Sequence, residues 1–221
     1  FNNNAKIALI DDMKNAYHIT QPIITKTDKE DYKTVFSDSI MLNVSRGCTR
    51  GCRFCMSSYL YRPLRETTIK ELVDIALKTR ENTNLNKITL IGAAVGDYYD
   101  LEGLTTALES EGFQIATPSL RIDSLSRETL ETLKKSGLKS ITIAPESIST
   151  LRERINKSIS DEKIFSVIKN AVDLDFNIKL YFLIGIPYES KEDIEELANY
   201  IEKIENMHKN RKYIKFSINP V

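Results

Sequence analysis

Short apolar runs rich in β-branched residues alternate along this chain with longer stretches in which apolar residues recur at helical spacing. The runs predict strands at residues 39–45, 87–93, 114–122, 140–145, 178–185 and 213–220. The stretches between them predict helices near residues 67–82, 101–111, 126–137, 147–175 and 190–207. We therefore expect six strands separated by five helical segments.

Residues with capping chemistry support two of these helices. Thr67 or Thr68 stands where a hydroxyl oxygen accepts a hydrogen bond from the first turn of a helix, and Ser126 holds the same place in a later one. Gly137 then stands where the later helix is expected to end, because glycine adopts the left-handed conformation of a helix terminus at little cost.

The order of the elements predicts the fold class. Strict alternation of strands and helices implies parallel strands joined by right-handed crossovers, and the apolar runs "ITLIG" and "LYFLIG" suit strands covered on both faces. Such units build either a barrel or an open doubly wound sheet. A complete eight-unit barrel usually needs about 250 residues. We therefore expect an α/β fold, a partial (β/α)6 barrel of the TIM type that is open where the chain ends.

The first 38 residues fit this alternation less well. "AKIALIDD" (5–12) and "PIITKT" (22–27) could form a hairpin or an edge strand, and Pro22 argues against a central strand because it has no N–H for the ladder. We expect residues 1–38 to be a short irregular or β extension, a remnant of an upstream domain or a linker from it. Residues 39–221 are expected to form the core domain.

Charge and composition narrow the setting. The chain carries 31 Lys and Arg residues against 31 Asp and Glu residues, so its charge does not indicate a nucleic-acid partner. Its longest apolar runs are far shorter than the roughly 20 residues that span a bilayer, and no signal segment opens it, so no membrane partner and a cytoplasmic location are expected. The first residue is Phe1 rather than Met, and we expect that a preceding segment was removed.

All three cysteines of the chain lie within eight residues. Cys48, Cys52 and Cys55 are spaced C-x3-C-x2-C, and an odd number of thiols in a chain of 221 residues argues against a disulfide framework. They follow the first predicted strand directly. Ligands in parallel α/β folds bind at the carboxyl ends of the strands, so position and chemistry agree on a ligand-binding loop.

The spacing favours an iron–sulfur cluster over zinc. A zinc site needs further ligands, and His18 and His208 are both remote in sequence from the thiols. Closely spaced thiolates can hold three corners of a cubane cluster and leave the fourth iron open. Glycines at positions 47 and 51 precede two of the cysteines, and arginines at positions 46, 50 and 53 bring positive charge that offsets a cluster.

The cysteine motif resembles the signature of the radical S-adenosylmethionine (radical SAM) superfamily, C-x3-C-x-aromatic-C, in which Phe54 supplies the aromatic residue. The resemblance extends over residues 40–220 and implies an enzyme. It implies that Cys48, Cys52 and Cys55 bind a [4Fe-4S] cluster whose open iron chelates S-adenosylmethionine. An electron from a low-potential donor such as a flavodoxin or ferredoxin would cleave that molecule to methionine and a 5′-deoxyadenosyl radical, which abstracts hydrogen from an unknown substrate.

The same resemblance implies which residues contact S-adenosylmethionine. Phe54 would pack near the adenine, Glu146 in "IAPES" would reach the ribose hydroxyls, and Lys157 in "RINKSIS" would bind the methionine carboxylate. Gly92 and Ala93, in "LIGAAVGDY", stand in the place of the family's glycine-rich turn, which contacts the methionine amino group. Asp97 is a weaker candidate for that contact. The remaining residues are Ser119 and Arg121, which would face the same cavity, and Ile184, Gly185 and Ile186, which would wall the adenine.

The sequences of these motifs most resemble those of a subgroup that includes radical methylases. Members of this subgroup are often fused to an N-terminal cobalamin-binding domain. No D-x-H-x-x-G occurs here, so cobalamin would have to be bound by a domain absent from this chain. One alternative is the core of a tRNA methylthiotransferase-like enzyme, which shares the "NKSIS"-like and "GIPYES"-like segments. Another alternative is a non-catalytic iron–sulfur scaffold or an electron carrier, although a carrier would need a fourth cysteine.

Overall fold

The computed structural model describes residues 10–22, 38–207 and 214–221. Most of the proposed hairpin in residues 5–12 and 22–27, and also His208, lie outside these ranges. Within residues 10–22 the chain forms a short 3-10 turn, Met13–Asn15. No helix in the described part of the chain is long and apolar enough to cross a membrane.

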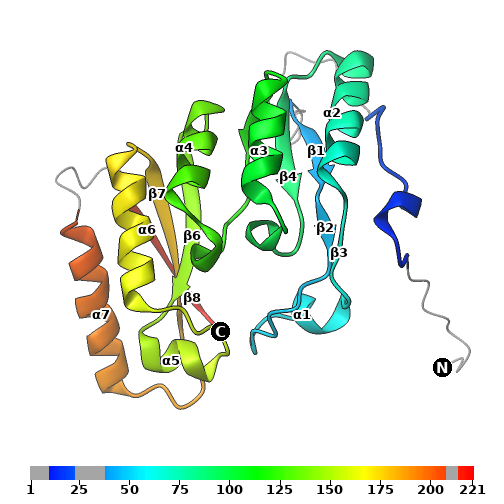
Figure 1. Ribbon diagram of the computed structural model, residues 1–221. Helices are drawn as coiled ribbons and strands as arrows, with labels where there is room; N and C mark the ends of the chain where they lie inside the picture. The colour runs from blue at the N-terminus through cyan, green and yellow to red at the C-terminus, as the bar shows by residue number, and fades with distance from the viewer. Residues whose placement is uncertain (1–9, 23–37, 208–213) are drawn as a thin grey trace, which may run out of the picture.

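The six predicted strands are all present, and their pairing is parallel. One sheet has the order β1-β4-β5 and the other the order β6-β7-β8. Their bounds are β1 Ile40–Asn43, β4 Lys87–Ile91, β5 Gln114–Ala116, β6 Ser140–Glu146, β7 Asn177–Ile184 and β8 Ile214–Pro220. Figure 1 shows the two sheets side by side with their strands running in one direction. The predicted α/β class and partial barrel are confirmed.

The third strand is shorter than predicted. It was expected to run to residue 122, but β5 ends at Ala116, and Pro118 removes a backbone donor from the segment that follows. Pairing resumes at a single point, where Leu120 N donates to Thr142 O at 2.8 Å and Leu120 forms an isolated parallel bridge with Ile143. This bridge connects the two sheets.

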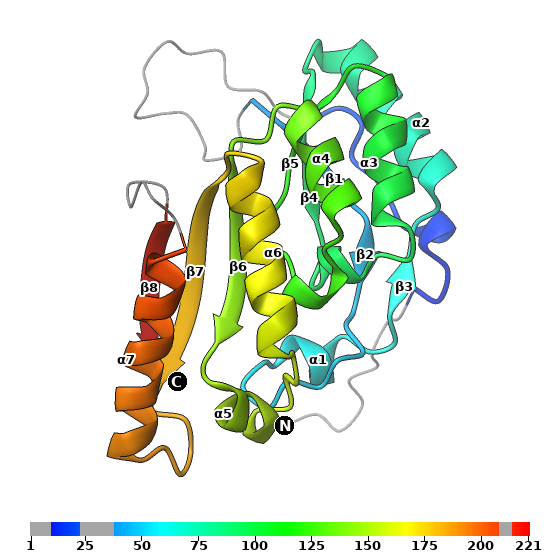
Figure 2. The same cartoon turned by 60° about the vertical axis from the view of Figure 1, so that its left-hand side comes forward.

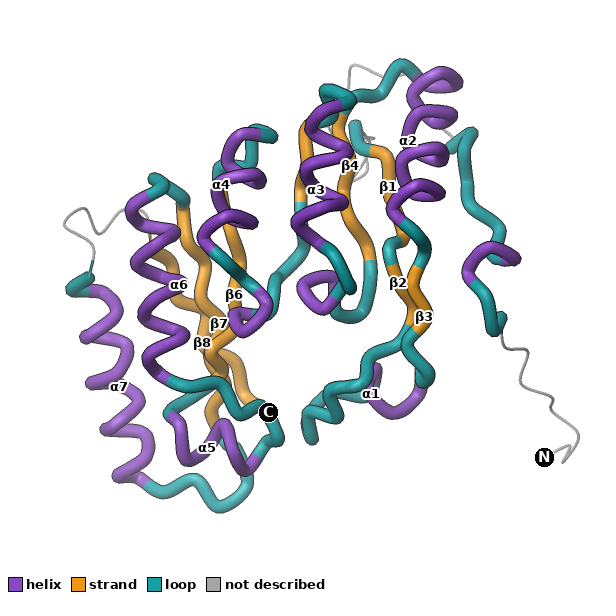
Figure 3. The backbone as a smooth tube through the Cα atoms, viewed as in Figure 1, coloured by secondary structure: helices purple, strands orange, loops and turns teal. Residues whose placement is uncertain are grey.

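The helices cover one face of the strands, as Figures 2 and 3 show. Their bounds are α2 Ile69–Thr83, α3 Leu101–Ser110, α4 Arg127–Lys135, α5 Ser149–Arg154, α6 Asp161–Asp173 and α7 Lys191–Glu205. Thr68 caps α2 in a capping box with Glu71, and Ser126 Oγ accepts a hydrogen bond from Thr129 N at the start of α4. The helical segment predicted at 147–175 consists of two helices, and the loop between them carries Lys157.

Three small elements around the cysteines were not predicted. β2, Ser45–Arg46, pairs with β3, Arg65–Glu66, in an antiparallel ladder, and α1, Ser57–Leu60, lies between them. Strands of two residues carry no readable period, so the sequence pattern could not reveal them. We call residues 47–64, which this ladder closes at its base, the cysteine loop.

The hydrophobic core lies between the strands and their helices rather than inside the barrel. Leu42 on β1 is 1% exposed and packs in the main core cluster, whereas its neighbour Met41, which alternation places on the opposite face, is 56% exposed. Asn43 lies on the same face of β1 as Met41, and its partner in the parallel ladder, Ile91 on β4, is also exposed. The inner face of the strands is therefore accessible, unlike the filled interior of a closed eight-stranded barrel.

We expect substitutions of adjacent residues on β1 to differ sharply in their effect on stability. Leu42→Ala removes a buried side chain and leaves a cavity, so it should lower the free energy of unfolding by about 2–5 kcal/mol. Met41→Ala should change it by less than about 0.5 kcal/mol because its side chain is already in solvent. Urea unfolding of both variants measures the difference, and equal losses would contradict the placement of the core.

Candidate cofactor site

The cysteine loop lies at the carboxyl ends of the strands, as predicted (Figure 1). Cys48 and Cys52 are each 7% exposed, and Cys55 is less deeply buried. Gly47 holds φ at 92°, and a Cβ on this residue would lie 2.4 Å from the carbonyl oxygens of both Tyr61 and Pro63. The position therefore requires glycine, because two backbone groups would have to move to admit any other residue.

Hydrogen bonds hold this loop against the segment that follows α5. Asn156 Nδ2 donates to the carbonyl oxygens of Arg50 at 3.1 Å and Gly51 at 2.9 Å. Arg53 N donates to Ile155 O at 2.9 Å. Within the loop, Tyr59 donates its hydroxyl to Gly51 O at 3.1 Å. Residues about a hundred positions apart in the chain are thus joined through backbone groups, which holds the loop against the segment after α5.

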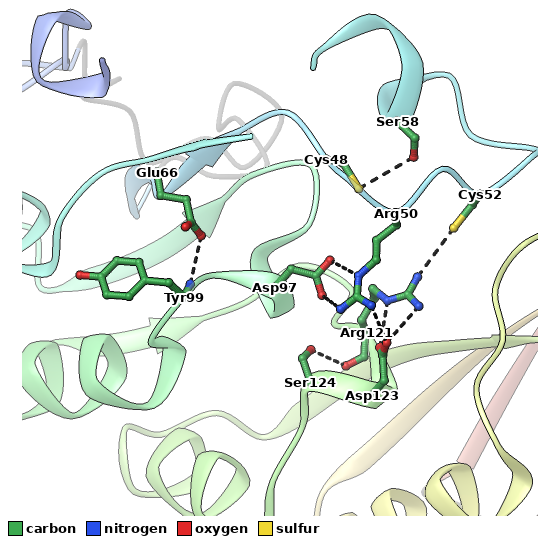
Figure 4. A network of polar contacts seen from close by, with 10 residues as sticks. All are labelled: Cys48, Arg50, Cys52, Ser58, Glu66, Asp97, Tyr99, Arg121, Asp123 and Ser124. Atoms are coloured by element: carbon green, nitrogen blue, oxygen red, sulfur yellow. Dashed lines mark hydrogen bonds and ion pairs between the residues drawn. The ribbon is translucent and has the colours of Figure 1, made fainter. Parts of the chain in front are cut away.

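A network of two arginines and two aspartates joins the loop to the ends of β4 and β5 (Figure 4). Arg50 of the loop forms a bidentate ion pair with Asp97, at 2.8 and 2.7 Å, and reaches Asp123 at 3.1 Å. Arg121 pairs with the same Asp123, at 2.9 and 3.1 Å. We call these four residues the arginine–aspartate network.

The charges in this network stabilise one another. Hydrogen bonds to Asp97 raise the pKa of the Arg50 guanidinium above its ordinary value. Burial by itself would raise the pKa of Asp123, but the hydrogen bond and charge of Arg121, together with the charge of Arg50, outweigh it and lower that pKa. These shifts favour the charged forms of Arg50 and Asp123. The network pairs two arginines with two aspartates, so its formal charges cancel.

Two of the three thiols accept hydrogen bonds from outside the motif (Figure 4). Arg121 Nη1 donates to Cys52 Sγ at 3.7 Å, and Ser58 Oγ donates to Cys48 Sγ at 3.8 Å. Sequence reasoning assigned Arg121 to the cofactor cavity but did not anticipate that it contacts a cysteine. It missed Ser58 and Asp123 altogether, because short hydroxyl and carboxylate residues occur throughout the chain and no spacing singles these out.

The residues present fit an iron–sulfur cluster better than a single metal ion. In the described ranges no three His, Cys, Asp or Glu side chains lie close enough together to hold one ion. A single zinc ion needs all its ligands within about 2.3 Å of one point, whereas each thiolate of a cubane cluster binds a different iron. Three thiols lie in one loop, and two of them accept a hydrogen bond, one from an arginine and one from a hydroxyl group. This arrangement matches what a cubane cluster needs.

Glu146 and Lys157 form a buried ion pair. Lys157 Nζ lies 2.6 Å from Glu146 Oε1, and both side chains are more than nine-tenths buried. Glu146 is the last residue of β6, beyond a register shift, and its φ of 69° is rare for a residue with a side chain. The structure thus brings together two residues that the sequence predicted to serve the same ligand, and it holds Glu146 in a strained conformation.

An apolar cavity of about 560 Å³ opens beside the cysteine loop. Phe54, 37% exposed, and Ile186, which is buried, are the two predicted residues among its lining. The other lining residues are Arg53, Arg154, Ile155, Pro187, Tyr188 and Val221. Tyr188 was missed although it stands only two residues after Ile186, because its placement depends on the turn after β7.

The other predicted residues do not line this cavity. Gly92 packs against Ser45, where a Cβ would lie 2.8 Å from Ser45 Oγ, and Ala93 and Ser119 are exposed at the strand ends. Two residues act through their backbone near the cavity: Gly185 N donates to Glu189 Oε2 at 2.6 Å, and Ile184 O accepts from Val221 N at 3.0 Å. His18, predicted not to be a ligand, lies with Nε2 3.4 Å from Met13 O.

Sequence comparison finds relatives of this chain among methyltransferases and methylthiotransferases. It is 37% identical over 206 residues to the protein MJ0966 of Methanocaldococcus jannaschii, covering 90% of this chain and 44% of that one. It is 28% identical to cytidylyl-2-hydroxyethylphosphonate methyltransferase of Streptomyces wedmorensis (77% and 34% covered). It is 24% identical to tRNA-2-methylthio-N(6)-dimethylallyladenosine synthase of Ehrlichia canis (86% and 47% covered). The chain spans less than half the length of these curated relatives.

Structural comparison finds the same fold in solved radical SAM enzymes. The radical S-adenosylmethionine methyltransferase TsrM from Kitasatospora setae, solved with cobalamin and a [4Fe-4S] cluster, superposes with a TM-score of 0.63. The match covers 80% of this chain and 34% of TsrM at 11% sequence identity, so it establishes the fold alone. The family model of the radical SAM superfamily matches residues 42–201. The chain therefore belongs to the radical SAM superfamily, whose enzymes use a [4Fe-4S] cluster and S-adenosylmethionine.

Proposed function

We propose that residues 39–221 form the catalytic core of a radical SAM enzyme whose cluster is held by Cys48, Cys52 and Cys55. The observation that carries this proposal is the convergence at one end of the strands of three features: the three thiols, the buried Glu146–Lys157 pair and the apolar cavity beside Phe54. When bound and reduced, the cluster would supply the electron that cleaves S-adenosylmethionine to methionine and a 5′-deoxyadenosyl radical.

The part of the protein in this chemistry is to bind, orient and exclude water. Asn156 already holds the backbone of the loop that bears the thiols. Cluster binding therefore needs little further ordering of that backbone. Lys157 is the cation for the methionine carboxylate, and Glu146 is the acceptor for the ribose hydroxyls. Because the two side chains already contact each other, they are positioned before the ligand arrives.

The apolar cavity is proposed to receive the adenine. Its volume is within the range of small-molecule sites, and Phe54 offers a ring face while Ile155 and Ile186 offer aliphatic walls. The backbone N–H of Gly185 is already occupied by Glu189, so we assign Gly185 and Ile184 the role of shaping the turn that bears Ile186. Gly92 and Ala93 remain proposals for contact with the methionine amino group, and Ser119 remains a proposal for a residue that faces the ligand cavity.

Radical methylation is the reaction class that we propose for the whole protein, with cobalamin bound by a domain outside this chain. Support comes from the Streptomyces wedmorensis relative, which is named a methyltransferase, and from the cobalamin bound in TsrM. A methylthiotransferase is the second candidate, favoured by the similarity to the Ehrlichia canis enzyme over 86% of this chain. Either reaction needs a low-potential electron donor, which we propose to be a small flavin or iron–sulfur protein.

The first test of the proposal is anaerobic reconstitution with iron and sulfide. The chain should bind about four irons, and after reduction with dithionite it should convert S-adenosylmethionine to 5′-deoxyadenosine even without a substrate. Slow uncoupled cleavage is expected because the inner face of the strands is open to water. Replacing any one of the three cysteines by Ala should abolish both iron binding and product, as measured by iron assay and chromatography.

Two results would separate the alternatives. A cluster-loaded, reduced protein that binds S-adenosylmethionine but forms no 5′-deoxyadenosine would favour the non-catalytic scaffold. A wild-type protein that binds no iron under these conditions would contradict the proposed function as a whole.

The proposed adenine cavity predicts a binding defect without a cluster defect. Phe54→Ala should weaken S-adenosylmethionine binding about two- to tenfold, because an aromatic contact of this kind contributes about 0.5–1.5 kcal/mol, and iron content should stay at the wild-type level. Tyr17→Ala is the matched control, since Tyr17 is an aromatic residue 84% exposed and outside the cavity. Calorimetry on the reconstituted proteins compares them, and equal affinities would exclude the adenine from this cavity.

The buried pair calls for a different design. Removing Lys157 alone would leave the Glu146 carboxylate buried without a partner, which can cost about 3–5 kcal/mol of stability. The double change Lys157→Met with Glu146→Gln removes both charges and should weaken S-adenosylmethionine binding at least tenfold while the iron content stays unchanged. Calorimetry and an iron assay measure both quantities, and loss of iron with unchanged affinity would show that the pair serves the cysteine loop instead.

A further inference from the structure

We propose that Arg121 is a positioning residue that raises the reduction potential of the cluster by donating a hydrogen bond to the Cys52 thiolate, an inference that rests on the proposed function. No other arginine of the described chain is found donating to a cysteine sulfur. The proposal concerns how readily the cluster accepts its electron, and it is separate from whether S-adenosylmethionine binds.

The geometry of Arg121 is determined by its partners. Two of its nitrogens, Nε and Nη2, bind the two oxygens of Asp123, at 2.9 and 3.1 Å, which leaves Nη1 directed at Cys52 Sγ, 3.7 Å away (Figure 4). The side chain is 15% exposed. A solvent-exposed arginine would sample many conformations, whereas the planar fork of this one is held at two points while the third faces the thiol.

Arg50 braces the same arrangement from the other side. It extends from the cysteine loop, pairs with Asp97, and also reaches Asp123, so one carboxylate binds an arginine from the loop and the arginine that faces Cys52. The loop and the hydrogen-bond donor are therefore fixed to a common point. Because the formal charges of the network sum to zero, its long-range field is small, and the local hydrogen bond is expected to dominate its effect on the cluster.

Hydrogen bonds to the sulfurs of a cluster affect its two redox states unequally. Adding one electron makes the cluster more negative, no bond of the protein forms or breaks, and a cationic donor stabilises the more negative state more strongly. Among the described residues, Cys48 accepts a side-chain hydrogen bond only from the neutral Ser58, and Cys55 accepts none. Of the three ligands, Cys52 is thus the one where a single substitution should change the potential most.

Redox titration of the reconstituted chain tests this inference. Arg121→Gln should shift the reduction equilibrium about tenfold toward the oxidised cluster, which is ~59 mV more negative for a one-electron couple, with iron and sulfide per chain unchanged. Ser58→Ala should shift the potential in the same direction by less. The titration uses dithionite with mediators, and electron paramagnetic resonance of the reduced cluster provides the signal.

The matched control is Arg127→Gln. Arg127 lies at the start of α4, pairs with the exposed Glu131, and contacts no cysteine, so its loss removes the same formal charge and should leave the potential at the wild-type value. A shift of equal size in Arg127→Gln and Arg121→Gln would overturn the inference, because it would attribute the effect to net charge rather than to the hydrogen bond. A fully loaded Arg121→Gln protein with the wild-type potential would also overturn it.

If Arg121→Gln fails to load iron, Arg121→Lys decides the question, since lysine keeps the charge but loses the two-point attachment to Asp123. A loaded Arg121→Lys protein with a more negative potential supports the inference, and one with the wild-type potential overturns it. Failure of both variants to load would also overturn it, because Arg121 would then be needed to assemble the site rather than to adjust its potential. Failure of the wild-type chain to load iron would instead reject the proposed function.

Discussion

Parallel pairing of the strands is the constraint on which the rest of this structure depends. Each crossover returns the chain to the same side, so the segments that follow β1, β4, β5 and β6 all emerge at one end of the sheets. Side chains that are distant in sequence meet there for this reason alone. Arg50, Asp97, Asp123 and Asn156 contact one another or the cysteine loop, and each follows a different strand.

The division of apolar surface between the two faces of the strands explains how a short chain can keep an accessible interior. Side chains such as Leu42 bury their area against the outer helices, and this burial supplies the stability of the domain. Inner positions such as Met41 are left in contact with solvent. The fold can therefore open its inner face to a substrate without weakening its core, because the two faces of each strand make different contributions.

Rigidity at the strand ends has a separate origin, since loops bury little apolar surface. The cysteine loop is held by the short β2–β3 ladder at its base, by Asn156 through backbone carbonyls, and by the ion pairs of Arg50. Isolated ion pairs at a surface contribute little, but a partly buried, bidentate network loses less side-chain entropy for each contact it makes. The loop can thus present its thiols in one arrangement while Cys55 retains access to a ligand.

The sequence by itself determined the features that depend on local periodicity and on rare residue types. Alternating periods predicted six parallel strands and their helices, and three thiols with their glycines and Phe54 were sufficient to place the cysteine loop and to indicate a cluster. The tertiary structure alone decided which common residues join that site. Ser58 and Asp123 resemble many other polar residues in the chain, and only the turns of the folded loops bring them to Cys48 and Arg121. Arg121 was assigned to the cavity from the sequence, but its contact with Cys52, 69 positions away, depends on the pairing of the parallel strands. Contacts between segments that are distant in sequence depend on how strands pair and where loops turn. No local pattern of residues encodes which distant segments will meet.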